Sequence, residues 1–264
     1  MRILFIGDIV GKPGRDVVRD KLEYVRQREG IDLVIANGEN AAAGSGLTPS
    51  ITNELFSNGV DIVTSGDHIW KRREIYDVLE KDKRILRPLN YPEGAPGRGA
   101  VTIDTRTMGK IGIVNIVGRV FMDAVECPFR KVKHAVEKIR KETHVIIVDM
   151  HAEATSEKVA MGWYLDGLVT AVVGTHTHIQ TADEKILPGG TAYITDCGMT
   201  GPYDSVIGRV KENVIERFVS QLPTRFDVAD KGVEMHGVII DMDAVTGKAT
   251  AIKRIQEKGA NLTI

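Results

Sequence analysis

Cysteine is scarce in this chain of 264 residues. Its only cysteines, Cys127 and Cys197, are far apart, and neither belongs to a Cys-x-x-Cys pair. This scarcity argues against a disulfide framework and against a thiolate zinc site. Cys197 has no evident base partner in the sequence around it, so we expect a small buried residue there. Such thiol usage suits a reducing compartment, and we expect a cytoplasmic protein.

Long apolar runs and an excess of one charge are also missing. The first apolar run, in MRILFIGDIVG, is short and interrupted by Asp8, which suits a first β-strand better than a membrane span or a secretion signal. The 35 Lys and Arg residues nearly balance the 36 Asp and Glu residues, which gives a formal net charge of -1. We therefore expect no membrane association and no stable binding to duplex nucleic acid, because no overall field attracts the protein to either.

Familiar nucleotide and nucleophile motifs are absent too. The stretch GDIVGKPG fits neither the dinucleotide pattern G-x-G-x-x-G nor the P-loop pattern G-x-x-x-x-G-K-[ST]. No G-x-S-x-G elbow occurs, which disfavours a serine hydrolase. An anionic ligand must therefore be attracted by other local groups.

The chain does contain an alternation of β-branched runs and helical patterns in its first third. We expect strands at residues 2–8, 31–40 and 60–68, with helices at residues 14–30 and 47–59 between them. Pro13 should lie just before the first helix, whereas Thr48 and Pro49 suit the cap and the first position of the second. This β-α-β-α-β order predicts parallel strands.

The remainder is less regular. We expect a loop at residues 87–99, a helix at 129–141, strands at 100–105, 111–118, 144–151, 168–178 and 190–198, and an antiparallel run at 224–230, 234–243 and 248–255. The composition, 42% apolar and 27% charged, is that of an ordinary globular protein. Because no repeat or linker interrupts the chain, we expect one α/β domain, residues 1–264, around a mixed, two-layered sheet.

Polar side chains collect where five apolar strands end. In chain order they are Asp8; Glu39 and Asn40; Asp67 and His68; His151; and His176 and His178. Ligands of an open α/β sheet bind outside the carboxyl ends of its strands, so we expect these clusters to converge on one crevice. On an extended segment, His176 and His178 would point to the same side because they are two residues apart.

These residue types suit metal ions. Mixed imidazole and carboxylate donors favour Fe, Mn or Zn over Mg. Seven or more donors exceed the needs of one ion, whereas a pair of ions roughly 3.5–4 Å apart, bridged by one carboxylate, would use them all. Such a pair binds phosphate and lowers the pKa of a bound water.

Each residue also has an ordinary alternative. Asp8 or Asp67 could cap a helix, and Glu39 and Asn40 could build a turn. The joint pattern favours the site, because coincidence would rarely place metal-capable residues at five independent strand ends. We interpret the remaining histidines as satisfied core or surface residues: His134, His144 and His236.

The order of these motifs resembles the calcineurin-like metallophosphoesterases and, more closely, the YmdB-like bacterial phosphodiesterases. The similar stretches are FIGDIVGKPGR, NGENAAAGSGLT, DMHAEATSEK, VVGTHTHIQTAD and AYITDCGMTGPYD, and they span nearly the whole chain. The resemblance implies a two-layered mixed β-sandwich flanked by helices. It also implies two metal ions, iron as Fe³⁺/Fe²⁺ or Mn²⁺, and hydrolysis of 2′,3′- and 3′,5′-cyclic nucleotides.

The resemblance further implies a role for each residue. One metal would be held by Asp8, Asn40 and His178, the other by Asp67, His151 and His176, with Glu39 bridging them and His68 as the proton donor. Val10 stands where the wider superfamily has a histidine, and Asn40 is its replacement, as in the YmdB-like branch. Asp67 departs from the usual Asn of a Gly-Asn-His motif, which changes the charge of the site.

Two functions therefore stay open. The first is a dinuclear phosphodiesterase acting on cyclic nucleotides or similar small phosphodiesters, in which water activated by the metal ions attacks phosphorus and His68 protonates the leaving oxygen. The second is a regulator on the same fold that binds a nucleotide or metal with negligible turnover. The complete ligand set with His68 favours the enzyme, because binding alone needs no proton donor. Phosphomonoesterase or nuclease activity stays open within the enzyme class, and the sequence is compatible with a homo-oligomer.

Overall fold

A computed structural model describes residues 1–105 and 109–259. Its helices and strands are, in chain order, β1 (Arg2–Ile6), β2 (Asp8–Ile9), α1 (Gly11–Glu29), β3 (Leu33–Asn37), α2 (Pro49–Ser57), β4 (Ile62–Thr64), the 3₁₀ helices η1 (Asp67–Lys71) and η2 (Arg73–Ile75), α3 (Tyr76–Lys81), β5 (Ala100–Thr105), β6 (Gly109–Val117), α4 (Pro128–Ile139), β7 (Ile146–His151), α5 (Thr155–Tyr164), β8 (Ala171–Thr175), β9 (Lys185–Ile186), β10 (Ala192–Ile194), β11 (Met199–Pro202), α6 (Lys211–Ser220), β12 (Val233–Met242) and β13 (Ala249–Lys258). No helix among these residues combines the length and the apolar character that crossing a membrane requires.

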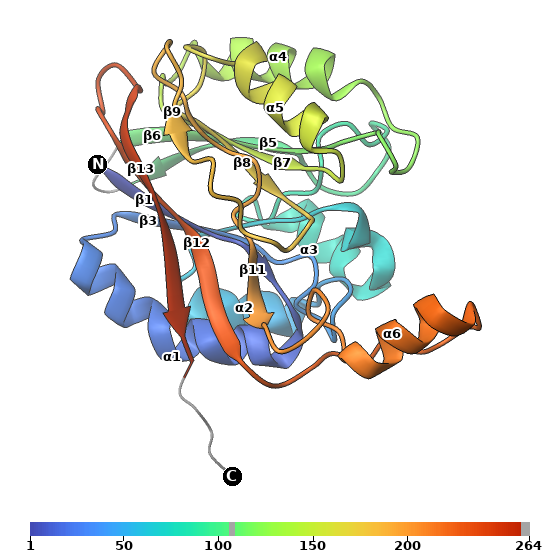
Figure 1. The fold of residues 1–264 in the computed structure, drawn as a ribbon. Helices are drawn as coiled ribbons and strands as arrows, with labels where there is room; N and C mark the ends of the chain where they lie inside the picture. Colours follow the sequence, from blue (N-terminus) through green and yellow to red (C-terminus); the bar gives the residue numbers. More distant parts are fainter. Residues whose placement is uncertain (106–108, 260–264) are drawn as a thin grey trace.

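The strands form two mixed sheets that pack face to face (Figure 1). The seven-stranded sheet has the order β2-β11-β12-β1-β3-β4, with β13 paired to β12, and β1, β3 and β4 are parallel as expected. The six-stranded sheet has the order β5-β6-β7-β8-β10-β9, with parallel strands from β6 to β10. Helices α1 and α2 cover the outer face of the first sheet, and α4 and α5 cover that of the second (Figure 1). The expected two-layered mixed sandwich flanked by helices is confirmed.

Alternate residues of β1 belong to two different cores. Leu4 and Ile6 pack with residues of α1 and α2, whereas Ile3 and Phe5 pack between the sheets with residues such as Ile147. Burying one such side chain contributes roughly 1.5–3 kcal/mol. Because both faces of the strand are covered, its sequence is apolar at consecutive positions rather than alternating with polar residues.

The helix boundaries follow local chemistry with one deviation. α2 begins at Pro49, and the Thr48 side chain accepts a hydrogen bond from the Ile51 N–H at 3.3 Å, so the expected cap is confirmed. α1 begins at Gly11, so Pro13 lies inside its first turn rather than before it. The N-cap of α1 is Val10, without a side-chain bond, and Asp8 is therefore not its cap.

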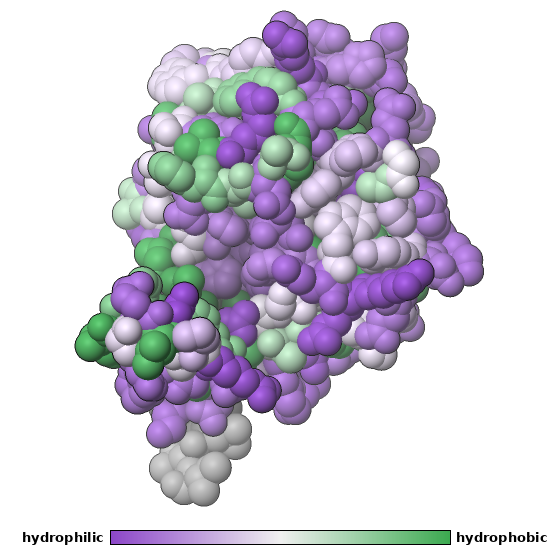
Figure 2. All heavy atoms as spheres, turned by 90° about the vertical axis from the view of Figure 1, so that its right-hand side faces the viewer, coloured by the Kyte–Doolittle hydropathy of each residue, from purple (hydrophilic) through white to green (hydrophobic). Residues whose placement is uncertain are grey.

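The expected strand at residues 224–230 is wrong. This segment makes only an isolated bridge between Arg209 and Val228, because no neighbouring strand runs beside it. It returns from α6, which projects from the body of the molecule (Figure 1). Apolar surface gathers on this projection, at the lower left of Figure 2, where Phe218 and Val219 are exposed. Helices α5 and α6 were not expected from the sequence.

Candidate metal centre

The polar strand ends meet in one place, but they come from both sheets rather than from one edge. The seven-stranded sheet contributes Asp8 at β2, Glu39 and Asn40 after β3, and Asp67 and His68 after β4. The six-stranded sheet contributes His151 at the end of β7, and His176 and His178 after β8. The two layers thus join at the carboxyl ends of their parallel strands.

Four of these side chains form the densest part of the site. Glu39, Asp67, His151 and His176 each offer a ligand atom, and these atoms all lie within 4.8 Å of one another. The His151 Nε2 atom lies 3.2 Å from Glu39 Oε1 and 3.4 Å from Asp67 Oδ1. It also lies 3.0 Å from His176 Nδ1. Two carboxylates and two imidazoles in this arrangement suit a transition-metal ion.

Asp8, Asn40 and His178 form a second group that adjoins the first. The Asn40 Nδ2 atom is 3.0 Å from Glu39 Oε1 and 3.2 Å from His178 Nε2. The Asp8 Oδ1 atom is 3.9 Å from His178 Nε2 and also 3.9 Å from His151 Nδ1. The structure therefore brings every residue of the expected ligand set to one site.

His68 lies at the rim of this site. Its backbone N–H donates to Glu39 Oε2 at 3.3 Å, and its Nδ1 is 2.8 Å from Asn40 Oδ1. Its Nε2 is 3.7 Å from Asp67 Oδ2, and the side chain is 32% exposed, whereas His151 is completely buried. The ring is thus oriented by Asn40 while it stays accessible to a ligand.

The backbone that carries His176 and His178 is bent, so the expectation of an extended segment is wrong. β8 ends at Thr175, and the two histidines have φ angles of 97° and 66°. Residues with side chains rarely adopt this region and do so when their surroundings hold them there. Here the His176 N–H donates to Asp8 Oδ2 at 3.1 Å, and His178 Nδ1 donates to the Ile207 carbonyl at 3.0 Å.

Gly66 permits the close approach of β4 to the site. A Cβ atom at this position would lie 2.1 Å from Glu39 Oε2 and 2.2 Å from His151 Nε2. Both are buried atoms of the site rather than ends of mobile side chains, so they could not move aside easily. The chain can therefore carry Asp67 and His68 to this place only if residue 66 has no side chain.

A buried polar group that was not expected from the sequence orients His151. The Thr175 hydroxyl is 2.9 Å from His151 Nδ1 and donates to Asp149 Oδ1 at 2.7 Å. Asn37 donates to Asp149 Oδ2 at 3.0 Å. The available signal was a polar residue inside an apolar strand, since Asp149 interrupts VIIVDM and Asn37 ends LVIAN.

A buried ion pair that was also not expected from the sequence lies next to the segment of the two bent histidines. Lys158 Nζ donates to Asp196 Oδ2 at 2.7 Å, and both side chains are completely buried. The same carboxylate oxygen accepts bonds from the N–H and the hydroxyl of Thr177, at 3.0 and 2.7 Å. Because Thr177 lies between His176 and His178, this pair holds the bend in place.

The sequence matches a known protein family over most of its length. The family model described as YmdB-like protein matches residues 4–255. The chain belongs to the YmdB-like family. A Bacillus subtilis protein named 2′,3′-cyclic-nucleotide 2′-phosphodiesterase is 48% identical over 256 residues, which cover 97% of this chain and 96% of that protein.

Two solved structures have the same fold as this chain. A hypothetical protein from Thermus thermophilus has a TM-score of 0.91 and 41% identity, with 98% of this chain and 99% of that chain covered. A protein from Mycoplasma pneumoniae described as a novel phosphatase has a TM-score of 0.92 and 35% identity, with 98% and 93% covered.

The electrostatics of the site in this YmdB-like chain favour a cation. Burial raises the pKa of Glu39, but the charge and hydrogen bond of His151 together with the charge of His68 outweigh burial and leave the pKa at about 2. Burial lowers the pKa of His151, but the carboxylates of Glu39 and Asp67 hold it well above its usual value. Burial and the neighbouring His151 lower the pKa of His176 to about 4. Negative potential is therefore concentrated around His151.

Two carboxylate oxygens indicate whether metal ions would fit this site. Asp8 Oδ1 and Asp67 Oδ1 are buried without any hydrogen-bond partner. A buried oxygen of this kind is unfavourable unless it is compensated, and a metal ion among imidazoles compensates it. Although Asp67 replaces the Asn that the YmdB-like pattern implies, its carboxylate still offers an oxygen ligand. The donor set therefore fits metal ions.

Other sequence expectations concern residues outside the centre. His236 is buried and lies 2.6 Å from the Tyr203 hydroxyl and 2.8 Å from Glu234 Oε2, as expected for a satisfied core histidine. His134 and His144 are on the surface. Cys197 is completely buried, and burial raises its pKa, so the expectation of a small buried residue is confirmed.

Proposed function

We propose that the protein is a metal-dependent phosphodiesterase that hydrolyses cyclic nucleotides, in both 2′,3′ and 3′,5′ forms, or similar small phosphodiesters. The observation that carries the proposal is the pair of unpartnered carboxylate oxygens of Asp8 and Asp67 in one site with imidazoles and the rim residue His68. The relatives named as a phosphodiesterase and a phosphatase support hydrolysis of phosphoesters.

The ligands divide into two sets around Glu39. Asp8, Asn40 and His178 would hold one ion, Asp67, His151 and His176 would hold the other, and Glu39 would bridge them. Carboxylate and imidazole donors suit iron, manganese or zinc, and the resemblance to the YmdB-like phosphodiesterases favours iron or manganese among them. When bound, the two ions would offset the charge of the phosphate and make a water molecule more acidic.

In this proposal His68 would act as the proton donor. In the reaction, a water oxygen forms a bond to phosphorus, the bond from phosphorus to a ribose oxygen breaks, and that oxygen needs a proton. His68 Nδ1 is paired with Asn40 Oδ1 at 2.8 Å, which orients the ring and leaves Nε2 to protonate the leaving oxygen. For a 2′,3′-cyclic substrate, release of the 2′ oxygen leaves a 3′-phosphate.

The exposure of the site suits a small substrate. The side chains of Asp67, His68 and His176 are 24%, 32% and 22% exposed, so these three of the proposed site residues form most of its accessible edge. Asp8 and Glu39 lie beneath, with side chains 0% and 1% exposed. A compact phosphate group can reach this edge, and the balanced net charge of -1 gives no attraction for a long duplex.

One experiment tests the proposal directly. Elemental analysis and assays with 2′,3′-cyclic AMP, 3′,5′-cyclic AMP and a phosphomonoester should be done on the same sample. We expect two equivalents of metal per chain and hydrolysis of the cyclic diesters well above that of the monoester. The Glu39→Gln variant, with its fold checked by circular dichroism, is the control and should lose both metal and activity.

Two results would contradict the proposal. A folded, metal-free and inactive protein that iron and manganese cannot reconstitute would contradict the metal-dependent reaction. Hydrolysis confined to the phosphomonoester would contradict the substrate class.

A further inference from the structure

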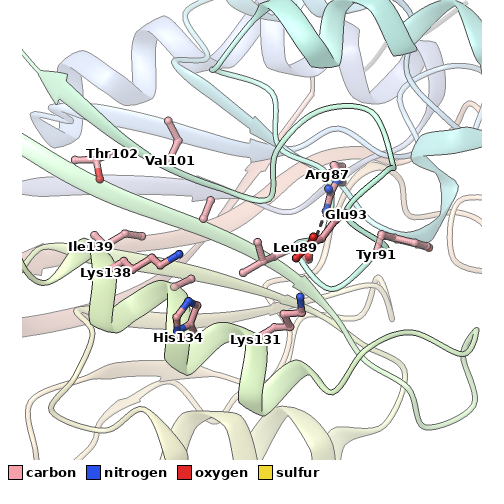
Figure 3. A pocket seen from close by; sticks show the side chains of 12 residues that line it. Arg87, Leu89, Tyr91, Glu93, Val101, Thr102, Lys131, His134, Lys138 and Ile139 are labelled. Carbon is pink, nitrogen blue, oxygen red and sulfur yellow. Dashed lines mark hydrogen bonds between the residues drawn. The ribbon is translucent and has the colours of Figure 1, made fainter.

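A cavity with cationic walls lies between α4 and the segment that leads into β5. Its volume is about 460 Å³, within the range of small-molecule sites. Its basic side chains are Arg87, Lys131, His134 and Lys138, and its one acidic side chain is Glu93. None of the proposed metal ligands lines it. Figure 3 shows Lys131 and Lys138 rising from α4 toward the loop that carries Arg87.

Arg87 brings a buried positive charge to this cavity. The residue is only 6% exposed, its Nη1 atom donates to the carbonyls of Pro88 and Leu89 at 2.8 and 3.2 Å, and its Nη2 atom donates to the carbonyl of Ala95 at 3.4 Å. Its Nε has no hydrogen-bond partner, and no carboxylate among the described residues forms an ion pair with it. Burial lowers the pKa of Arg87, yet a guanidinium remains protonated in proteins. An anion in the cavity would compensate this charge.

Helix α4 adds a second set of cationic groups. Lys131 and Lys138 are seven residues apart, which is about two helical turns, so both lie on the face that lines the cavity. Lys131 Nζ already pairs with Glu126 at 2.8 Å. Lys138 has no acidic partner within the described ranges, and it is therefore available for a ligand.

The charges of the side chains that line the cavity indicate the chemical class of its ligand. Arg87 and Lys138 carry positive charges without an ion-pair partner among the described residues, whereas Lys131 is paired with Glu126, and Glu93 is the one carboxylate of the lining. A phosphate monoester presents three terminal oxygens, so it can contact Arg87 and Lys138 together, whereas a carboxylate presents only two. Leu89 and Ile139 also line the cavity and offer an apolar surface for the rest of the molecule.

We propose that this cavity is a second binding site, for a small phosphate monoester of the size of a mononucleotide or a sugar phosphate. Its phosphate faces the basic side chains of α4 and Arg87, and its organic part contacts Leu89 and Ile139. Tyr91, which also lines the cavity, packs edge-on against Trp70 with ring centroids 5.5 Å apart. Trp70 belongs to η1, the element that carries His68, so the two sites are separate but adjoin through this contact.

Calorimetric titration of the metal-loaded protein tests the proposal with 5′-AMP, ribose 5-phosphate and adenosine as probes. Lys138→Glu is the test variant, and Lys133→Glu is its matched control because it changes the same charge on the same helix but does not line the cavity. We expect both phosphates to bind to wild type and to Lys133→Glu with similar affinity. Lys138→Glu should weaken both about tenfold, because it removes a charge-assisted contact and adds repulsion.

A second titration distinguishes binding in the cavity from binding at the candidate metal centre. The cavity event should persist in the Glu39→Ala variant, since Glu39 does not line the cavity. Equal affinities for Lys138→Glu and Lys133→Glu would overturn the proposal, as would adenosine binding as tightly as 5′-AMP. Absence of binding by either phosphate in the millimolar range would also overturn it.

Discussion

Glu39 contacts both halves of the candidate metal centre through one carboxylate oxygen. Its Oε1 atom is 3.0 Å from Asn40 Nδ2 and 3.2 Å from His151 Nε2. We therefore expect Glu39→Ala to lose nearly all bound metal, whereas His178→Ala should lose about half, because His178 belongs to one ligand set only. Elemental analysis of folded variants measures this difference. Small and equal losses in both variants would contradict the bridging role.

Asp67 gives the centre an additional negative charge. Its Oδ1 is buried without a hydrogen-bond partner, 3.4 Å from His151 Nε2. Asp67→Asn keeps an oxygen ligand but removes the charge, so metal affinity should fall while KM for an anionic diester should not rise. Metal titration and steady-state kinetics at full metal occupancy measure the two effects. A clearly raised KM under those conditions would show that the charge of Asp67 does not oppose substrate binding.

We expect the contribution of His68 to the reaction rate to depend on the leaving group of the substrate. A ribose alkoxide needs a proton as it departs, whereas a nitrophenolate delocalises its charge. We expect His68→Ala to keep its metal and to lose on the order of 10²- to 10⁴-fold in kcat on a cyclic nucleotide, the usual scale of acid catalysis. The loss on bis-nitrophenyl phosphate should be much smaller. If chemistry limits both reactions and both lose equally, His68 positions the phosphate instead.

At the scale of elements, the segment after β8 depends on a buried ion pair from α5. Lys158 and Asp196 are both completely buried, and Asp196 holds Thr177 between the two bent histidines. Lys158→Met leaves the Asp196 carboxylate without its charged partner. We expect about 3–5 kcal/mol less free energy of unfolding, the usual effect of breaking a buried pair. Urea denaturation measures this change.

An exposed pair provides the matched control for this substitution. Lys110 Nζ lies 2.9 Å from Glu142 Oε2, and both side chains are about half exposed, at 49% and 48%. Lys110→Met should change the free energy of unfolding by less than about 1 kcal/mol, because solvent screens such a pair. Similar losses of unfolding free energy for the two substitutions would show that the buried Lys158 pair stabilises the fold no more than an exposed pair does.

At the scale of the whole molecule, the candidate metal centre lies where the two sheets meet. Asp8, Glu39 and Asp67 come from the seven-stranded sheet, whereas His151 and His176 come from the six-stranded sheet. Metal that binds only the folded state stabilises it by about 2.7 kcal/mol at 100 times its Kd. In a chain of this length that corresponds to roughly 5–10 °C in Tm. Chelation should therefore lower Tm by about this amount, as calorimetry can measure.

A control variant shows whether the change in Tm on chelation comes from metal bound at the candidate centre. In the Glu39→Gln variant, which is expected to bind little metal, the same chelator should leave Tm nearly unchanged. A comparable drop in both proteins would mean that the chelator acts elsewhere.

Sequence alone determined the features that rest on local chemistry. Thr48 and Pro49 begin α2, and Gly30 ends α1 with a φ angle of 65°, because caps and left-handed positions depend on the residues at one place in the chain. The parallel order of β1, β3 and β4 followed from the alternation of strands and helices. The candidate residues from Asp8 to His178 were found because each follows an apolar strand, which a linear pattern records.

Only the tertiary structure decided how distant segments meet. The left-handed backbone of His176 and His178 is held by Asp8 and Ile207, which lie far away in the sequence. The partners of Asp149 and Lys158 likewise come from other elements, so nothing in their neighbourhoods shows what they bind. The segment 224–230 has the alternation of a strand but gains no ladder, since pairing requires a neighbour that the fold does not place there. Contacts of this kind depend on packing between layers, and a linear pattern does not contain that information.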